Sequence, residues 1–321
     1  MRVLHDTSRV DPDLRRGVVT IGNFDGIHQG HARLLRRCVE RAGGGAVVAM
    51  TFDPAPVAVL SPDRAPRRLT PLSEKLRLLE TRGATAAMVL RTDAALLSLT
   101  PEQFVEGVLA APLAPRCVVE GPTFRFGVGR SGSVDTLREL GPRFGFDVDV
   151  VPPAEIELPP PDVRQIVSSS LVRRLIAEGR VEAAAGCLDR PYVLIGPVIH
   201  GAARGRGLGF PTINIDIGDM QWPADGVYAG RARFECATQA GPFPAAISVG
   251  SRATFGTGVR VIEAYLLDHE GERYGQTARL ELVSWVRAQR AFASPEELTQ
   301  QIARDVEAVR RVAALCSEPR P

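Results

Sequence analysis

The chain has 321 residues, of which 45% are hydrophobic and 24% charged, and its formal net charge is +2 at pH 7. This length predicts two domains, and this composition is typical of a globular protein. A balanced charge with no basic run gives no indication of nucleic-acid binding, and no apolar run is long enough to span a bilayer. The N-terminus lacks a signal-peptide apolar region, so we expect a cytoplasmic protein. The scattered cysteines are expected to be reduced and inert: Cys38, Cys117, Cys187, Cys236 and Cys316.

The first half of the chain alternates strand-like apolar runs with helix-like segments. The segments between the runs have the crossover lengths that a parallel sheet requires. We therefore expect a doubly wound α/β domain over about residues 1–185. The expected strands are Val18–Ile21, Ala46–Phe52, Ala86–Leu90, Cys117–Glu120 and Val148–Val151.

Two helices in this half have clear start signals. Thr70-Pro71 and Thr100-Pro101 each place a capping residue before a proline at the first helical position, and Gln103 completes a capping box after Thr100. Gly83 is a plausible stop for a helix over Leu72–Arg82.

The stretch Val18–Arg33 joins the first strand to a helix through a turn at residues 22–26. His28, Gly30 and His31 follow on the first turn of that helix. A helix start beyond the carboxyl end of a strand offers free N–H groups to an anion. Two imidazoles add donors, and a glycine lets a phosphate approach the backbone. This pattern predicts a phosphate site; the alternative is two histidines that cap a surface helix.

The second half has a different texture. A proline-rich run at residues 158–161 is expected inside the first domain, and helices are expected after Val167 and over Val181–Leu188. From Tyr192 onward, short β-branched and aromatic runs with frequent glycine predict a small antiparallel barrel. A final helix starts at Ser294 with a capping box. The expected barrel strands are Val193–Ile199, Gly226–Phe234, Ala245–Val249, Val261–Leu267 and Arg279–Val286.

A second phosphate-binding pattern lies at residues 196–215, where glycines and arginines precede Pro211-Thr212-Ile213-Asn214. Mobile glycines let backbone N–H groups wrap a polyphosphate. Thr212 and Asn214 are two residues apart on an extended strand, so their oxygens share one face and suit Mg²⁺. The chain contains neither a Walker A sequence nor a protein-kinase signature.

Glu263 lies in a strand with apolar neighbours. A carboxylate there could accept the proton of an attacking hydroxyl. The alternative is an exposed strand carboxylate without a catalytic role.

His28-x-Gly30-His31 resembles the signature of the nucleotidylyltransferase superfamily, and the whole chain resembles the bacterial bifunctional riboflavin kinases/FMN adenylyltransferases, or FAD synthetases. The segments that carry this resemblance are GNFDGIHQGH (22–31), TFDPAP (51–56), LTPEQFVEGVL (99–109), FRFGVGRSG (124–132), VSSSLVRRL (167–175) and PTIN (211–214). The resemblance implies an FMN adenylyltransferase domain over residues 1–185 and a riboflavin kinase domain over 186–321. One chain would phosphorylate riboflavin to FMN and adenylylate FMN to FAD, releasing pyrophosphate, with ATP and Mg²⁺.

In the first domain the FMN phosphate would attack the α-phosphorus of ATP directly, so no protein nucleophile is needed. His28 and His31 would donate hydrogen bonds to the phosphates and neutralise developing charge. The alternative for each arginine is a solvated surface residue, and the alternative for the serine run is a simple helix cap. The ATP- and phosphate-binding residues expected here are Gly22, Asn23, Phe24, Asp25, Gly30, Arg125, Arg130, Ser168, Ser169, Ser170 and Arg173.

In the second domain the resemblance makes Glu263 the base that accepts the proton of the ribityl hydroxyl, and Thr212 and Asn214 the Mg²⁺ ligands. The ATP- and flavin-binding residues expected here are Gly201, Arg204, Arg206, Gly209, Pro211, Thr212, Asn214, Tyr228, Arg287 and Phe292.

The chain departs from the usual family residues at several positions that concern flavin- and ATP-side contacts. The departures, with the usual residue, are Ala55 (His), Thr123 (acidic or amide), Ser133 (Asp), Leu171 (Arg), Ser248 (Asn), Ala253 (Pro) and Gln289 (Glu).

Other functions remain open on the sequence. One is a flavin-binding protein, or a transferase that has lost one of the two activities; another is a transferase that modifies a different phosphate. The expected partners are riboflavin, FMN and ATP, without nucleic acid or membrane, and the chain is expected to be a monomer or a transient oligomer.

Overall fold

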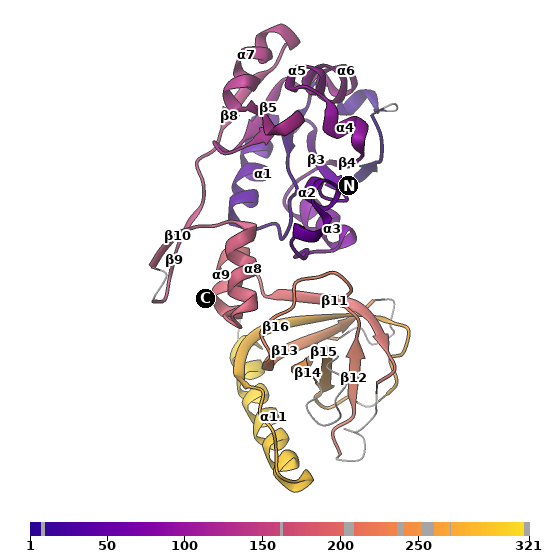
Figure 1. The fold of residues 1–321 in the computed structure, drawn as a ribbon, viewed down its shortest axis with the longest axis vertical. Helices are drawn as coiled ribbons and strands as arrows, with labels where there is room; N and C mark the ends of the chain where they lie inside the picture. The colour runs from indigo at the N-terminus through magenta and orange to yellow at the C-terminus, as the bar shows by residue number, and fades with distance from the viewer. Residues whose placement is uncertain are drawn as a thin grey trace. The chain divides into compact units, whose positions relative to one another are not determined.

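The chain divides into two units, Met1–Ser169 and Ser170–Pro321. Figure 1 draws the first in indigo to magenta and the barrel of the second in orange. This computed structural model describes residues 1–7, 10–160, 163–201, 209–235, 241–251, 260–269 and 271–317, with helix side chains described as far as residue 314.

A parallel sheet in the order β1-β4-β3-β2-β5-β8 forms the centre of the first unit. The five strands expected from the sequence are all present, with ends within one residue of the prediction; β1 is an additional short edge strand. The strands are β1 (Arg2–Leu4), β2 (Val18–Ile21), β3 (Val47–Asp53), β4 (Ala86–Arg91), β5 (Cys117–Glu120) and β8 (Asp147–Val150).

Helices cover both faces of this sheet, which confirms the doubly wound α/β architecture (Figure 1). On one face, α1 (Gln29–Ala42) and α3 (Leu72–Thr81) contribute Leu35 and Leu79 to a buried cluster with strand residues. On the other face, Leu109 and Leu137 pack with Met50. The helices that cover this second face are α5 (Pro101–Phe104), the π-helix η3 (Val105–Ala110), α6 (Ala111–Leu113) and α7 (Val134–Phe144).

Short elements complete the first unit. They include two antiparallel hairpins, β6–β7 and β9–β10. Pro159 and Pro160 lie in a turn directly after β9, and β10 leads back towards the serine run. These elements are η1 (Pro12–Leu14), α2 (Pro56–Leu60), η2 (Pro62–Arg64), α4 (Ala94–Ser98), β6 (Arg125–Phe126), η4 (Val128–Arg130), β7 (Gly132–Ser133), β9 (Glu155–Leu158) and β10 (Val163–Ile166).

Of three helix caps predicted from the sequence, one is confirmed in full, one in part, and one was wrong. The Thr100–Gln103 capping box is confirmed. Ser294 Oγ accepts from Glu297 N at 3.2 Å, although Glu297 itself accepts from Ala293 N at 3.0 Å. The prediction for Thr70 was wrong: α3 begins one residue later, with Pro71 in the capping position and no side-chain cap.

The second unit is a closed antiparallel barrel in the order β11-β12-β15-β14-β13-β16, which confirms the predicted barrel. Alternation along each strand fills its interior; in β15, Ile262, Ala264 and Leu266 are buried. The strands are β11 (Tyr192–Ile199), β12 (Thr212–Ile215), β13 (Gly226–Phe234), β14 (Phe243–Ser251), β15 (Arg260–Leu266) and β16 (Thr277–Ala288).

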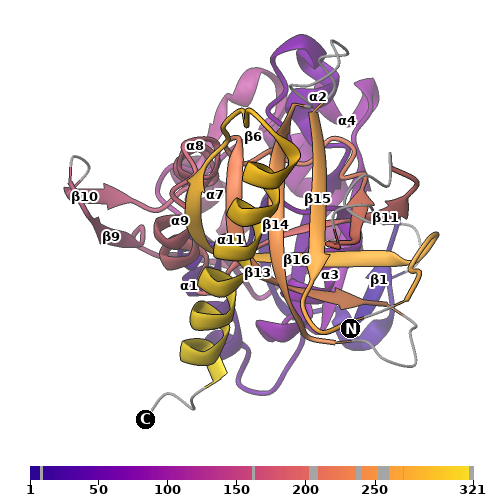
Figure 2. The same cartoon turned by 90° about the horizontal axis from the view of Figure 1, so that it is seen from below.

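Helices pack on the outside of the barrel. The long helix α11 (Pro295–Ser317) lies over β13 and β14 (Figure 2), where Val306 and Val309 contact Tyr265 and its neighbours. Before the barrel, α8 (Ser169–Ala177) is followed by α9 (Val181–Leu188), which contacts β16 and β11.

Candidate active sites

The histidine loop, residues 22–28, connects the end of β2 to the start of α1. His28 is the N-cap of α1, and its Nδ1 accepts a hydrogen bond from Gly30 N at 3.1 Å. This bond places the ring proton of neutral His28 on Nε2. A Cβ at residue 30 would lie 3.0 Å from His28 Cε1, so glycine leaves the space that this ring occupies.

The two histidines form a stacked pair. Their ring centroids are 3.7 Å apart, and the Phe24 ring meets His31 edge-on at 5.2 Å. His28 is 6% exposed, whereas His31 is partly exposed with a covered Nδ1 that has no hydrogen-bond partner among the described residues. Burial first, then the charges of His28 and Lys75, lowers the pKa of His31 well below its ordinary value. At neutral pH His31 is therefore a neutral imidazole.

Hydrogen bonds from distant segments hold the histidine loop in place. The Asp25 carboxylate accepts from Leu69 N at 2.9 Å and from Thr70 N at 3.1 Å. Thr70 Oγ1, which the sequence suggested as a helix cap, instead accepts from Gly26 N at 3.3 Å. Ser169 Oγ donates to the Asp25 carbonyl at 2.8 Å, so the serine run begins beside this loop. Asp25 thus shapes the loop.

Three polar residues behind the loop were not predicted as part of the site. Thr51 Oγ1 donates to the Asn23 carbonyl at 3.3 Å, and Lys75 Nζ donates to Thr51 Oγ1 at 3.3 Å. Glu120, at the end of β5, accepts from Ile21 N at 2.6 Å. Thr51 and Glu120 could have been detected from the sequence, because each is a polar residue that follows a run of apolar or small residues within its strand.

Glu120 lies where β2 and β5 separate at their carboxyl ends. Backbone pairing between the two strands is limited to Val18 with Cys117 and Val19 with Val118, and the Glu120 side chain takes over the pairing of Ile21 N. The residue is 2% exposed, and burial raises the pKa of its carboxyl well above the ordinary value.

This burial gives an expected pH dependence of stability. The unfolded chain loses the Glu120 proton near the ordinary pKa of 4.5. The folded chain keeps it, so the free energy of unfolding falls as pH rises above that value. Glu120→Gln removes this ionisation. Over the affected range, the difference in unfolding free energy, variant minus wild type, should rise by up to about 1.4 kcal/mol per pH unit. Urea unfolding of both proteins between pH 5 and 8 measures it; parallel curves would contradict the buried carboxyl.

The remaining predicted residues of the first unit lie outside this network or at its edge. Arg125 and Arg130 are exposed, and Arg125 Nη1 donates to Phe124 O at 3.3 Å. Among the described residues, neither arginine hydrogen-bonds to the histidine loop. Ser168 is partly buried just before α8, while Ser170 and Arg173 lie on α8 in the second unit. Their phosphate-binding roles stay predictions.

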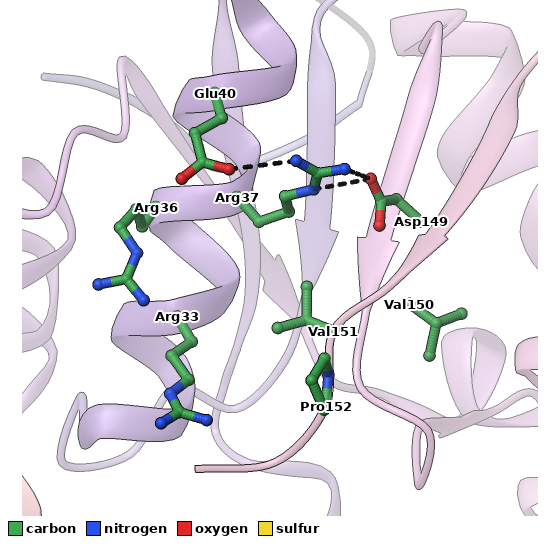
Figure 3. A pocket seen from close by; sticks show the side chains of 8 residues that line it. All are labelled: Arg33, Arg36, Arg37, Glu40, Asp149, Val150, Val151 and Pro152. Carbon is green, nitrogen blue, oxygen red and sulfur yellow. Dashed lines mark hydrogen bonds and ion pairs between the residues drawn. The ribbon is translucent and has the colours of Figure 1, made fainter.

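A separate surface pocket of about 420 Å³ lies beside α1 (Figure 3). The histidine pair does not line it. Arg37 is paired with Asp149 at 2.9 Å, whereas Arg36 is exposed and has no hydrogen-bond or ion-pair partner among the described residues. The pocket is lined by Arg33, Arg36, Arg37, Glu40, Asp149, Val150, Val151 and Pro152.

On the barrel, the polar residues predicted for the second site share one outer face. Strand register pairs Asn214 with Glu263 and Thr212 with Tyr265, while the intervening Ile213 pairs with the interior residue Ala264. Because side chains alternate across a strand, Thr212, Asn214 and Glu263 project from the same side. The hydroxyl, amide and carboxylate oxygens of these residues are donors that suit Mg²⁺.

A glycine contact orders the middle of this face. Asn214 is 6% exposed, and a Cβ at residue 201 would lie 2.1 Å from its Nδ2, so Gly201 packs directly against the amide. Gly209 has a φ of +82°, which favours glycine, and Pro211 is exposed ahead of β12. Arg204 and Arg206 lie outside the described residues.

The other residues predicted for the second site have structural partners. Tyr228 is fully buried, its hydroxyl donating to Ala224 O at 2.7 Å. The Arg287 guanidinium forms a bidentate pair with Asp305 of α11, with Nη2–Oδ2 at 2.7 Å and Nε–Oδ1 at 3.0 Å. The same guanidinium lies over the Phe292 ring, with Arg287 Cζ 5.7 Å from the ring centroid. The flavin-side roles of these residues stay predictions.

Comparison with known proteins gives the family. A family model for FAD synthetase matches residues 10–160, and one for riboflavin kinase matches residues 188–313. The "Bifunctional riboflavin kinase/FMN adenylyltransferase" of Escherichia coli K12 is 35% identical over 290 residues, covering 90% of each chain. The protein of the same name from Pseudomonas fluorescens is 32% identical over 317 residues, covering 98% of each. The chain belongs to this family.

A solved structure shares the fold of this riboflavin kinase/FMN adenylyltransferase family member over nearly all of its length. It is titled "Crystal Structure of Macrolide-efflux Protein from Streptococcus pneumoniae" and has a TM-score of 0.83 at 28% identity, covering 96% of this chain and 98% of that one. Among the described residues, α11 and the shorter helices all lack the length or the apolar content for a transmembrane span.

Two of the departures from the usual family residues are in contact. Gln289 Nε2 donates to Ser248 Oγ at 2.9 Å and to Val249 O at 3.2 Å. Strand register places Ser248 directly opposite Glu263. Gln289, where the family usually has glutamate, therefore bonds to the residue that is the cross-strand neighbour of Glu263. Ala253 lies outside the described residues, and Ser133 caps α7 by accepting from Thr136 N at 3.4 Å.

Proposed function

We propose that this chain makes FMN from riboflavin and FAD from FMN, with adenylyl transfer at the histidine loop and phosphoryl transfer on the outer barrel face. The observation that carries the proposal is the separation of the two family matches onto two units that each present phosphate-suited residues. ATP is the co-substrate of both steps.

In adenylyl transfer, a phosphate oxygen of FMN attacks the α-phosphorus of ATP, and the bond to the β-phosphate oxygen breaks to release pyrophosphate. His28 presents an Nε2–H donor, because its Nδ1 is occupied by Gly30 N. Neutral His31, stacked on it, donates from its accessible edge. These donors and the partial positive charge at the N-terminus of α1 stabilise charge that develops on the phosphates.

In phosphoryl transfer, the ribityl hydroxyl attacks the γ-phosphorus of ATP, its proton passes to Glu263, and ADP leaves. Asn214 is the cross-strand neighbour of Glu263, and Thr212 lies on the same face. Thr212 and Asn214 would hold Mg²⁺, which neutralises phosphate charge when bound. Two protein ligands are enough for Mg²⁺ here, because substrate phosphates and water would supply its other ligands.

The catalytic domains are proposed to extend over residues 1–185 and 186–321, and the protein to work as a monomer or transient oligomer in the cytoplasm. Cys38, Cys117 and Cys187 are buried free thiols, which supports a reducing compartment.

The direct test is to incubate the pure chain with riboflavin, ATP and Mg²⁺ and to separate the flavins by chromatography. We expect FMN first and FAD afterwards. Tight flavin binding without either product would support a flavin-binding protein. Formation of only one of the two products would support a transferase that has lost one activity. A chain that neither binds nor converts flavin would overturn the proposal in favour of another phosphate substrate.

A further inference from the structure

Lys75 is a buried amine directly behind the histidine loop. It lies on α3, far from that loop in sequence, and is 7% exposed. Its Nζ donates to Thr51 Oγ1 at 3.3 Å, and Thr51 Oγ1 donates to the Asn23 carbonyl at 3.3 Å. The amine is thus connected through one hydroxyl to the backbone that precedes the two histidines.

Two carboxylates and a guanidinium act on the buried Lys75 amine. Burial lowers the pKa of the Lys75 ammonium, but the carboxylates of Asp25 and Asp53 act in the opposite direction. Arg68 adds a smaller lowering effect, and it lies 3.8 Å from Asp53. Asp25 also accepts hydrogen bonds from the backbone N–H groups of Leu69 and Thr70. These bonds offset part of its negative charge and so weaken its effect on Lys75.

Lys75 also acts electrostatically on His31. The covered Nδ1 of His31 has no hydrogen-bond partner among the described residues, and His28 stacks on its ring. The charged and titratable groups that act on His31 are His28 and Lys75, both of which disfavour a positive charge on its ring.

We propose that Lys75 is a positioning residue for adenylyl transfer: its buried amine fixes the Asn23 carbonyl through Thr51 and acts on His31 from within the first unit. This inference rests on the proposed function of the histidine loop. Lys75 acts through other residues and through its field, so it needs no contact with substrate. A fixed charge in a site of low dielectric acts strongly because it needs no reorganisation during the reaction.

The test compares Lys75→Met with Lys75→Arg in the full chain. The methionine variant should lower kcat for conversion of supplied FMN to FAD by about tenfold or more, with a smaller change in KM. The arginine variant keeps the charge and should restore much of the rate. Riboflavin phosphorylation should stay unchanged in both, because Lys75 lies outside the barrel unit, and cooperative urea unfolding checks that the first unit is folded in each variant.

A second readout does not depend on activity. The imidazole pKa of His31, followed by NMR, should move upward in Lys75→Met because a repelling charge is lost. Arg36→Met is the matched control: it removes a positive charge from the exposed side of the helix that carries His31 (Figure 3) and should change neither measurement.

The outcomes separate the two proposals. If Lys75→Arg is as impaired as Lys75→Met, or if the His31 titration is the same in wild type and Lys75→Met, the proposed role of Lys75 is wrong. If the wild type itself makes no FAD, the proposed function fails, while the His31 titration still decides the electrostatic part of this inference.

Discussion

His28→Ala is expected to stop FAD formation while FMN continues to accumulate. The variant loses the Nε2–H donor to the ATP phosphates, and removal of one preorganised donor to developing charge lowers kcat by about 10²–10³. It also loses the N-cap interaction with Gly30 N. The measurement is chromatography of flavins from riboflavin, ATP and Mg²⁺ over time.

His28→Asn separates the two losses. Asparagine is a good N-cap and keeps α1 started, but it cannot place a donor where the imidazole Nε2 lies. We expect it to be as defective in FAD formation as His28→Ala, with better stability. Recovery of FAD formation in His28→Asn would show that helix capping, not phosphate contact, is the role of His28.

Glu263→Gln is expected to block FMN formation and leave supplied FMN convertible to FAD. The amide keeps the shape of the side chain but cannot accept the ribityl proton, and loss of a general base costs about 10²–10⁴ in rate. Riboflavin phosphorylation and FMN adenylylation are measured separately on the same preparation.

A matched carboxylate on the same barrel provides the control. Glu281 on β16 is paired with Arg231 at 3.2 Å, and Glu281→Gln should leave FMN formation near the wild-type rate. If Glu263→Gln or His28→Ala abolished both activities in a folded chain, the assignment of one reaction to each unit would be wrong.

The strands of the first unit could be predicted from the sequence because their apolar runs are continuous and bounded by turn residues. The network around the histidine loop could not. Asp25 and Thr70 are 45 residues apart, and Glu120 and Ile21 are 99 apart. Thr70 illustrates the difficulty: its position before a proline has the local pattern of a helix cap, yet a tertiary hydrogen bond takes its hydroxyl.

The barrel shows the same limit. Alternation predicted that Thr212 and Asn214 share a face, because that depends only on spacing along one strand. Which strand lies beside them depends on β-pairing over a long separation, and so the juxtaposition of Asn214 with Glu263 required the structure. Lys75 had no local signal at all, since a lysine on an amphipathic helix is ordinarily solvated.

The bidentate contact between Arg287 and Asp305 has a consequence for the C-terminal end of the molecule. Asp305 is 4% exposed and also accepts from Gln301 Nε2 at 2.7 Å. A truncated chain that stops before Asp305 would leave the guanidinium without its counter-ion and uncover the apolar surface around Tyr265. The last helix is therefore an integral part of the barrel unit, and removing it is expected to destabilise the barrel that carries Glu263.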